Sequence, residues 1–265
     1  MNQIKEYKTI IVEVIEDEKK ATVMLNRPER LNGMNLPMVE ELIGAFTDLK
    51  AADINVAILR GSGDKFSAGA DLSEMKERSA KEWGFVVERY LDIIRAIIDV
   101  PVPVISAING DAVGGGLGLC LASDIRIAKS SALLGFPFIK IGISGADMGS
   151  SYFLPKLVGH TAASDMLYTG KLVKADDAVR MGLINYSVSE EEFENKINEY
   201  VTNFTNGPGY AIRFTKKALV GSLDNCRARQ FDLETFAQTQ CLQTKDSKEG
   251  IDSFLKKRKP SYVGA

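Results

Sequence analysis

The sequence predicts an α/β protein with an almost wholly helical C-terminal part. Short runs rich in Val, Ile and Thr recur along the N-terminal half, and helical stretches separate several of them. Some strand-like runs follow one another directly, which argues against a simple alternating parallel sheet. From Ser189 onward the apolar residues keep a helical spacing. We therefore expect a core over residues 1–188 and a helical module over residues 189–265.

The N-terminal part alternates strands and helices. The expected strands are residues 9–14, 21–25, 56–59, 102–108 and 124–128. Asn35 is placed to cap a helix that extends to about Leu49, since Pro37 suits its first turn. A second helix, over about residues 81–98, would carry on one face Trp83, Val87, Tyr90, Ile94 and Ile97.

The C-terminal part is predicted to hold four helices. Ser189 and Glu192 form a capping-box pattern at the start of the first one. Pro208 restarts a second helix, and a third carries Phe231, Phe236 and Cys241. A last helix is expected to begin near Ile251 and Phe254.

Composition excludes several classes of protein. A net charge of −2 from 33 basic and 35 acidic residues gives no field that would favour nucleic acid or an anionic membrane. The first six residues lack a signal segment, and no run approaches the roughly 18 apolar residues of a membrane span. We therefore expect a cytoplasmic protein whose partner is neither nucleic acid nor membrane.

Cysteine and histidine are too sparse for a metal site or a disulfide framework. Cys120, Cys226 and Cys241 are widely spaced and odd in number, so we expect reduced cysteines in the core. The single histidine, His160, is expected to have a structural or exposed role at a helix end. No metal is expected.

Two glycine-rich turns are the most informative part of the chain. Residues 66–72 and 109–118 each follow an apolar strand-like run and lead into a helix-like one. Small residues let backbone amides approach a developing negative oxygen, and a helix start adds unpaired N–H groups and a favourable dipole. The two turns are therefore predicted to form two halves of one oxyanion hole.

With these turns, the chain resembles the crotonase (enoyl-CoA hydratase/isomerase) superfamily over nearly its whole length. The similar segments, in the family's order, are residues 26–34, 66–72, 109–118, 123–128, 153–159 and 256–260. The resemblance implies a crotonase-like spiral of ββα turns followed by a helical trimerisation module. It also implies assembly as a homotrimer or a dimer of trimers.

The resemblance further implies the ligand and the residues that meet it. The ligand is a coenzyme A thioester, which is the substrate itself, and no prosthetic group is implied. The backbone N–H groups of Ala70 and Gly115 would hold the thioester oxygen, where the charge of an enolate collects. Further contacts to coenzyme A are implied for the backbone around Ala68, Ala70, Asp71 and Leu72, and, near its phosphates, for Arg27 and the region of Lys256 and Lys257.

The resemblance also allows a choice among the family's reactions. A hydratase of this family carries two glutamates, and the matching positions here are Gly118 and Phe138. Neither residue can exchange a proton, so hydration by two glutamates is disfavoured. Counting back from residues 154–155, Asp147 falls where some acyl-CoA isomerases of the superfamily place a catalytic aspartate. Asp147 is therefore the candidate base for a double-bond shift.

Several alternatives stay open. Asp147 could instead cap the helix that begins near Gly149, while Met148, Phe138 and Tyr152 could supply an apolar wall that raises its basicity. Five other acids are weaker candidates for the base: Asp71, Glu74, Glu77, Asp111 and Asp124. The same hole would serve a hydratase, a hydrolase, a decarboxylase or a ring-modifying enzyme, and loss of both glutamates would also suit a catalytically weak acyl-CoA-binding protein. Dinucleotide-binding and serine-hydrolase motifs are absent.

Overall fold

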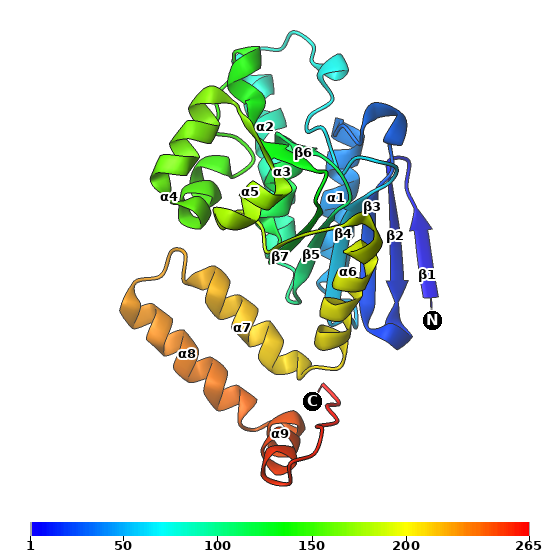
Figure 1. Cartoon of the computed structure of the whole chain (residues 1–265), viewed down its shortest axis with the longest axis vertical. Coiled ribbons are helices and arrows are strands. Elements are labelled where there is room, and N and C mark those ends of the chain that lie inside the picture. Colours follow the sequence, from blue (N-terminus) through cyan, green and yellow to red (C-terminus); the bar gives the residue numbers. More distant parts are fainter. Residues whose placement is uncertain (1, 265) are drawn as a thin grey trace.

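A twisted sheet with helices on both faces forms the body of the protein, and further helices extend from one end of it (Figure 1). The computed structural model describes residues 2–264. The main sheet has the order β1-β2-β3-β4-β5-β7-β10. Its strands are β1 (Asn2–Glu6), β2 (Ile10–Ile15), β3 (Lys20–Leu25), β4 (Val56–Gly61), β5 (Val104–Ile108), β7 (Ile125–Lys129) and β10 (Tyr186–Val188).

The strands pair in two ways. The first three are antiparallel, whereas each neighbouring pair from β3 to β10 is parallel. The five expected strands are confirmed to within two residues at each end, but β1 and β10 were not predicted. A second sheet, also not predicted, pairs β6 (Ala112–Val113), β8 (Leu133–Gly135) and β9 (Leu172–Lys174).

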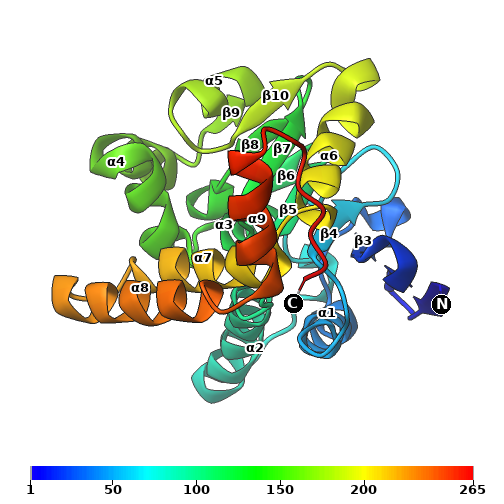
Figure 2. The same ribbon diagram turned by 90° about the horizontal axis from the view of Figure 1, so that it is seen from below.

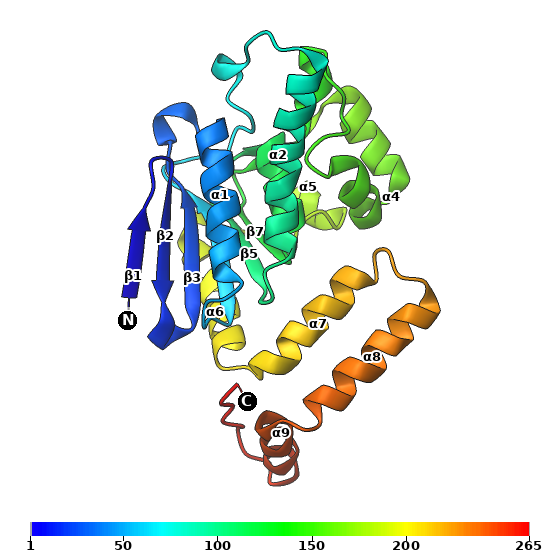
Figure 3. The ribbon, with the colours of Figure 1, turned by 180° about the vertical axis from the view of Figure 1, so that it is seen from behind.

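Apolar cores lie on both faces of the main sheet. Helices α1 (Leu36–Leu49) and α2 (Ala80–Ile98) cover one face, as Figure 3 shows, and α6 (Glu190–Thr205) covers the other. Along β4, Val56 and Ile58 pack in the smaller core with α6, whereas Ala57 and Leu59 pack in the larger one. This alternation follows from the two-residue period of a strand. It explains why central strands read as continuous apolar runs.

The predicted Asn35 cap begins the first helix, and a cap that was not predicted begins the second. The Asn35 side chain accepts a hydrogen bond from the Met38 amide at 3.0 Å, which satisfies one of the free amides at the start of α1. Ser79 and Glu82 form a reciprocal capping box at the start of α2. The remaining helices of the body are α3 (Gly115–Ala122), α4 (Ser150–Thr169) and α5 (Ala175–Arg180), with 3-10 turns η1 (Glu16–Glu18), η2 (Pro28–Arg30), η3 (Leu72–Glu74) and η4 (Pro137–Ile141).

The C-terminal helices α7 (Gly209–Gly221), α8 (Arg227–Cys241) and α9 (Lys245–Leu255) extend away from the body (Figure 1). The prediction that Ile251 and Phe254 begin the last helix is wrong, because α9 starts at Lys245 after the Thr244 cap. Helix α7 is anchored by the buried Lys216, whose ammonium donates to the Val102 carbonyl at 2.9 Å. Large apolar side chains stay exposed on these helices, namely Leu219, Phe231, Phe236, Leu242, Ile251, Phe254 and Leu255.

His160 is exposed, as expected, and it directly follows Gly159, where the helical geometry of α4 breaks. Two local expectations need correction. Of the cysteines only Cys120 is buried, while Cys226 is exposed and Cys241 half-buried. The turn after β4 leads into the short η3 before α2, and not directly into an α-helix. Between residues 2 and 264, no helix combines the length and apolarity needed to span a membrane.

Candidate active site

The two glycine turns lie against each other. Ser67 and Ala112 form a parallel bridge, in which the Val113 amide donates to the Ser67 carbonyl at 2.9 Å. Gly69, at a φ of +89°, approaches so closely that an added Cβ would lie 3.0 Å from the Gly115 nitrogen. Only a residue without a side chain combines this conformation with this contact. The sequence thus brings the two turns together backbone to backbone.

The Ala70 amide is left free by the way the first turn is held. Ala70 forms a parallel bridge with Met34, in which the Met34 amide donates to the Gly69 carbonyl at 2.7 Å. The Asp71 amide returns a bond to the Met34 carbonyl at 2.9 Å. Because these bonds use the residues on either side, the Ala70 amide points away from Met34. Within residues 2–264 it has no hydrogen-bond acceptor.

The Gly115 amide is free for a different reason. Gly115 is the first residue of α3, and the opening amides of a helix have no acceptor within it. Gly115 is buried, and a Cβ there would lie 2.6 Å from the Met34 side chain. Two backbone donors, one from each turn, are therefore available in one place.

Ala70 and Gly115 line one cleft together with Asp147. Its wall is mainly apolar, and its large apolar and aromatic side chains include Met34, Trp83, Val86, Tyr90, Phe138 and Met148. The chain thus gathers four of the predicted site residues, since Asp71 also lines the cleft, and Phe138 and Met148 lie in the wall as expected. Tyr152 does not: its hydroxyl donates to Asp224 at 2.8 Å, and it lines a different cavity beside α7.

Asp147 is half-buried near the end of the loop, residues 142–149, that leads into α4. Its Oδ1 accepts a hydrogen bond from the Met148 amide at 2.7 Å. Burial raises the pKa of this carboxyl above its usual range, and the Met148 bond opposes the shift only in part. Gly149 stands at the N-cap of α4, and no side chain caps the helix. The helix-cap alternative for Asp147 therefore does not match the structure.

Met148 fills the space next to Gly118. A Cβ on Gly118 would lie 2.5 Å from the Met148 Cβ and 2.9 Å from its carbonyl oxygen. Met148 is buried and adopts a φ of +51°, a left-handed conformation that is rare for a residue with a side chain. No acid can therefore occupy position 118 unless this loop moves.

Arg27 stabilises the first turn through contacts with Asp71 and Gly33. Its guanidinium lies 3.0 Å from the Asp71 carboxylate, and it donates to the Gly33 carbonyl at 2.6 Å. The Ser73 hydroxyl and Arg27 together hold the pKa of Asp71 below its usual range. Ala68 and Leu72, on either side of the turn, are exposed.

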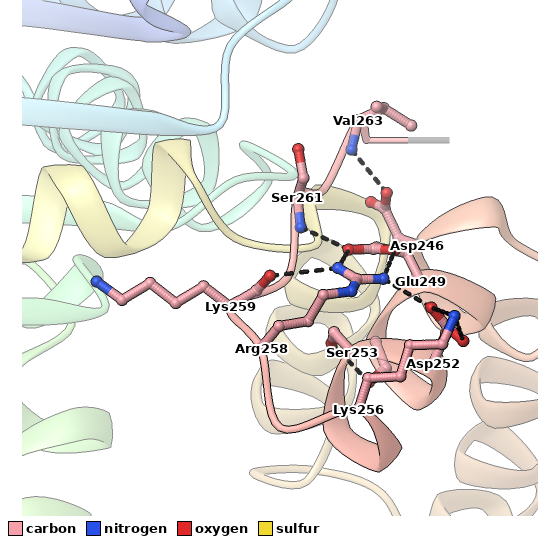
Figure 4. Close-up of polar contacts among 10 residues, drawn as sticks. Asp246, Glu249, Asp252, Ser253, Lys256, Arg258, Lys259, Ser261 and Val263 are labelled. Atoms are coloured by element: carbon pink, nitrogen blue, oxygen red, sulfur yellow. Dashed lines mark hydrogen bonds and ion pairs between the residues drawn. The ribbon is translucent and has the colours of Figure 1, made fainter.

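The predicted lysines lie elsewhere. In Figure 1 the turn after β4 is at one end of the molecule and α9 is at the other, which Figure 2 views from below. Lys256 pairs with Asp252 at 2.8 Å, and Lys257 follows α9 at a φ of +53°. Figure 4 shows Arg258 binding Glu249 and Asp252, so the end of the chain folds back on α9. Within one chain, these lysines do not reach the cleft.

The other acids differ in their positions. Asp71 and Glu74 line the cleft, and Glu74 accepts a bond from the Asn35 amide group at 3.2 Å. Asp111 pairs with Lys65 at 2.6 Å, and Asp124 pairs with Lys216 at 2.8 Å, so both hold the fold together. Glu77 is exposed. Within residues 2–264, no three His, Cys, Asp or Glu side chains are grouped so that they could hold a metal ion.

Sequence reasoning missed the roles of two residues. Met148 was expected to form part of the wall. Its contact with Gly118 was not predicted, because it requires a left-handed conformation at Met148 that no sequence motif indicates. Met34 was matched as part of a segment, but its bridge to the first turn was not foreseen. The apolar face expected for the second helix is confirmed in part, because Trp83 and Tyr90 of α2 both line the cleft.

The fold, with its two facing glycine turns, is that of the crotonase superfamily. A solved enoyl-CoA hydratase from Geobacillus kaustophilus HTA426 superposes with a TM-score of 0.94 and 26% identity, and 100% of each chain is covered. The enoyl-CoA hydratase structure from Bacillus anthracis has a TM-score of 0.88 and 32% identity over 100% of this chain and 99% of that one.

Residues 17–265 match the family model described as enoyl-CoA hydratase/isomerase, and the chain belongs to that family. Crotonyl-CoA hydratase of Syntrophomonas wolfei subsp. wolfei is 35% identical over 97% of this chain and 98% of that protein. The 1,2-epoxyphenylacetyl-CoA isomerase of Escherichia coli K12 is 32% identical over 92% of this chain and 94% of that protein. The similar proteins thus include both a hydratase and an isomerase.

Proposed function

We propose that this protein is an enoyl-CoA isomerase that shifts a double bond through a thioester enolate. The amides of Ala70 and Gly115 hold the thioester oxygen, and Asp147 is the base. One observation carries the proposal: Asp147 shares the cleft with both free amides, while the positions of the two hydratase glutamates hold Gly118 and Phe138.

The residues suit a two-step proton shift. The Asp147 carboxylate takes a proton from C2 of a 3-enoyl thioester, and the C–H electron pair forms a C1–C2 double bond while charge moves to the thioester oxygen. The same carboxyl then returns the proton to C4, where the C3–C4 π electrons form the new C–H bond. The C1–C2 electrons move to C2–C3, and the charge on oxygen re-forms the thioester carbonyl. One acid suffices, no water is consumed, and coenzyme A enters only as part of the substrate.

Electrostatics supports the roles assigned to these groups. Two backbone donors lie beside a mainly apolar wall. Loss of one such donor typically costs about a hundredfold to a thousandfold in rate. Burial makes Asp147 a stronger base than an exposed aspartate. We assign the coenzyme A contacts to the backbone around Ala68, Ala70, Asp71 and Leu72, with Arg27 acting through the turn that it braces.

Assays with two isomeric substrates test the reaction. We expect the purified protein to convert a 3-enoyl-CoA to the conjugated 2-enoyl-CoA faster than it hydrates the 2-enoyl-CoA. Faster hydration would favour the reaction named for the crotonyl-CoA hydratase relative. Tight binding of both substrates without turnover would support an acyl-CoA-binding protein instead.

We also propose a homotrimer or a dimer of trimers. The exposed apolar side chains of α8 and α9 support this assembly. Large exposed apolar patches usually mark an interface with another protein chain. Phe254 is 83% exposed, which is unusual for a large aromatic side chain unless a partner covers it. Sedimentation velocity should give the mass of three or six chains, whereas a single-chain mass would contradict this assembly.

A further inference from the structure

Tyr90 connects the wall of the cleft to the first glycine turn. It lies on α2 and lines the cleft beside Ala70 and Asp147. Its hydroxyl donates a hydrogen bond to the Met34 carbonyl at 2.8 Å, although 56 residues separate the two in sequence. One end of this side chain therefore faces the substrate cleft, and the other holds the backbone.

The Met34 carbonyl is the acceptor that orients the first turn. It also receives the Asp71 amide at 2.9 Å, so two donors share its two lone pairs. Asp71 follows Ala70 directly, and the Met34 amide binds Gly69 on the other side. The direction of the Ala70 amide thus depends on where the Met34 peptide lies.

We propose that Tyr90 is a positioning residue for the oxyanion hole: its hydroxyl fixes the Met34 carbonyl, and this carbonyl sets the direction of the Ala70 amide. The inference rests on the proposed function, because it needs Ala70 to bind the thioester oxygen. It also gives α2 a second task. Helix α2, which lines the cleft, also keeps in place the Ala70 amide that would polarise the thioester carbonyl.

Charges around the phenol keep it a donor. Burial, followed by the negative Glu74, Asp147 and Asp71 carboxylates, raises the pKa of Tyr90 to about 12, and only Arg78 acts in the opposite direction. The hydroxyl therefore stays protonated over the working range of pH. Its bond to Met34 does not depend on the ionisation of Asp147.

The test is Tyr90→Phe, which removes the hydroxyl and keeps the ring. The readout is the carbonyl stretch of bound butyryl-CoA, labelled with ¹³C at the thioester carbon, measured by infrared difference spectroscopy. In the unmodified protein we expect the stretch to move to lower frequency on binding, because two amides polarise the bond. In Tyr90→Phe we expect this shift to shrink and kcat to fall about tenfold to a hundredfold, with KM nearly unchanged.

Two controls separate positioning from general damage. Tyr168→Phe removes a hydroxyl from a side chain that is 78% exposed and should leave both the shift and kcat unchanged. S-butyl-CoA, a thioether without the carbonyl oxygen, should bind equally to the unmodified protein and to Tyr90→Phe. An unchanged carbonyl shift and kcat in Tyr90→Phe would overturn the role of Tyr90 alone. Absence of a shift in the unmodified protein would overturn the oxyanion hole itself, and the role of Tyr90 with it.

Discussion

Met148 and Gly118 fit together so closely that a Cβ on Gly118 would lie 2.5 Å from the Met148 Cβ. The same Met148 donates its amide to the Asp147 carboxylate. The glycine at a position where a hydratase carries an acid therefore makes room for the loop that brings Asp147 to the cleft. In this chain the missing acid and the candidate base belong to one local arrangement.

Gly118→Ala tests this arrangement. In a helix interior Ala is usually favoured over Gly by about 1 kcal/mol, but here the methyl group collides with Met148. We expect a loss of about 1–3 kcal/mol in the free energy of unfolding, typical of overpacking, together with lower isomerase activity. Chemical denaturation and turnover measure the two effects.

Gly44→Ala is the matched control, because Gly44 also lies inside a helix and a Cβ there meets nothing within 4 Å. This variant should be slightly stabilised and fully active. A Gly118→Ala protein that behaved like Gly44→Ala would show that Met148 does not depend on the glycine.

The pH dependence of kcat/KM should report the Asp147 carboxylate. Burial raises its pKa, and only the ionised form can take a proton from C2. Activity should therefore fall on the acid side with an apparent pKa above about 3.9, the usual value for aspartate. A steady-state profile over the acid range checks this, and an acid limb at or below the usual value would contradict the buried base.

The difference in stability between Asp147→Asn and the unmodified protein should also depend on pH. A carboxyl whose native pKa is raised binds more protons in the folded than in the unfolded state, so it costs stability as pH rises through the interval between the two values. Asp147→Asn should melt above the unmodified protein at neutral pH. The difference should vanish below the unfolded pKa, and thermal melts at several pH values would show it. An equal difference at all pH values would point to packing and not to charge.

The pair of Arg27 and Asp71 should be structural. Both side chains are largely buried, so Arg27→Gln leaves a carboxylate without its cation and should cost about 3 kcal/mol. Arg27→Gln combined with Asp71→Asn should recover part of this loss. Arg60→Gln removes an exposed pair with Glu194 and should cost less than about 1 kcal/mol. Equal losses for the two single arginine variants, by denaturant unfolding, would contradict the bracing role.

The sequence predicted the larger elements because their signals are local. The apolar runs of β2, β3, β4, β5 and β7 and the Asn35 cap each depend on a few neighbouring residues. Strands of two or three residues, such as β6 and β9, carry too short a pattern to be recognised. The fold was inferred from matched motifs, which also located Ala70, Gly115 and Asp147.

Contacts between distant segments could not be predicted in this way. Tyr90 reaches Met34 and Arg27 reaches Asp71 only after the chain has folded, and no spacing in the sequence encodes either distance. The left-handed conformation of Met148 could not be predicted either, because Met148 packs against Gly118, which is 30 residues away in the sequence. The lysines near residue 256 matched a family segment, yet within one chain they do not line the cleft.

Turnover of a 3-enoyl-CoA by Asp147→Asn tests the central claim most directly. Asparagine keeps the size of the side chain and an oxygen that can accept the Met148 amide, but it cannot take a proton. We expect a folded protein with unchanged acyl-CoA affinity and isomerisation slowed about a hundredfold to ten-thousandfold, as is typical for loss of a general base. Isomerisation at the unmodified rate would show that Asp147 is not the base.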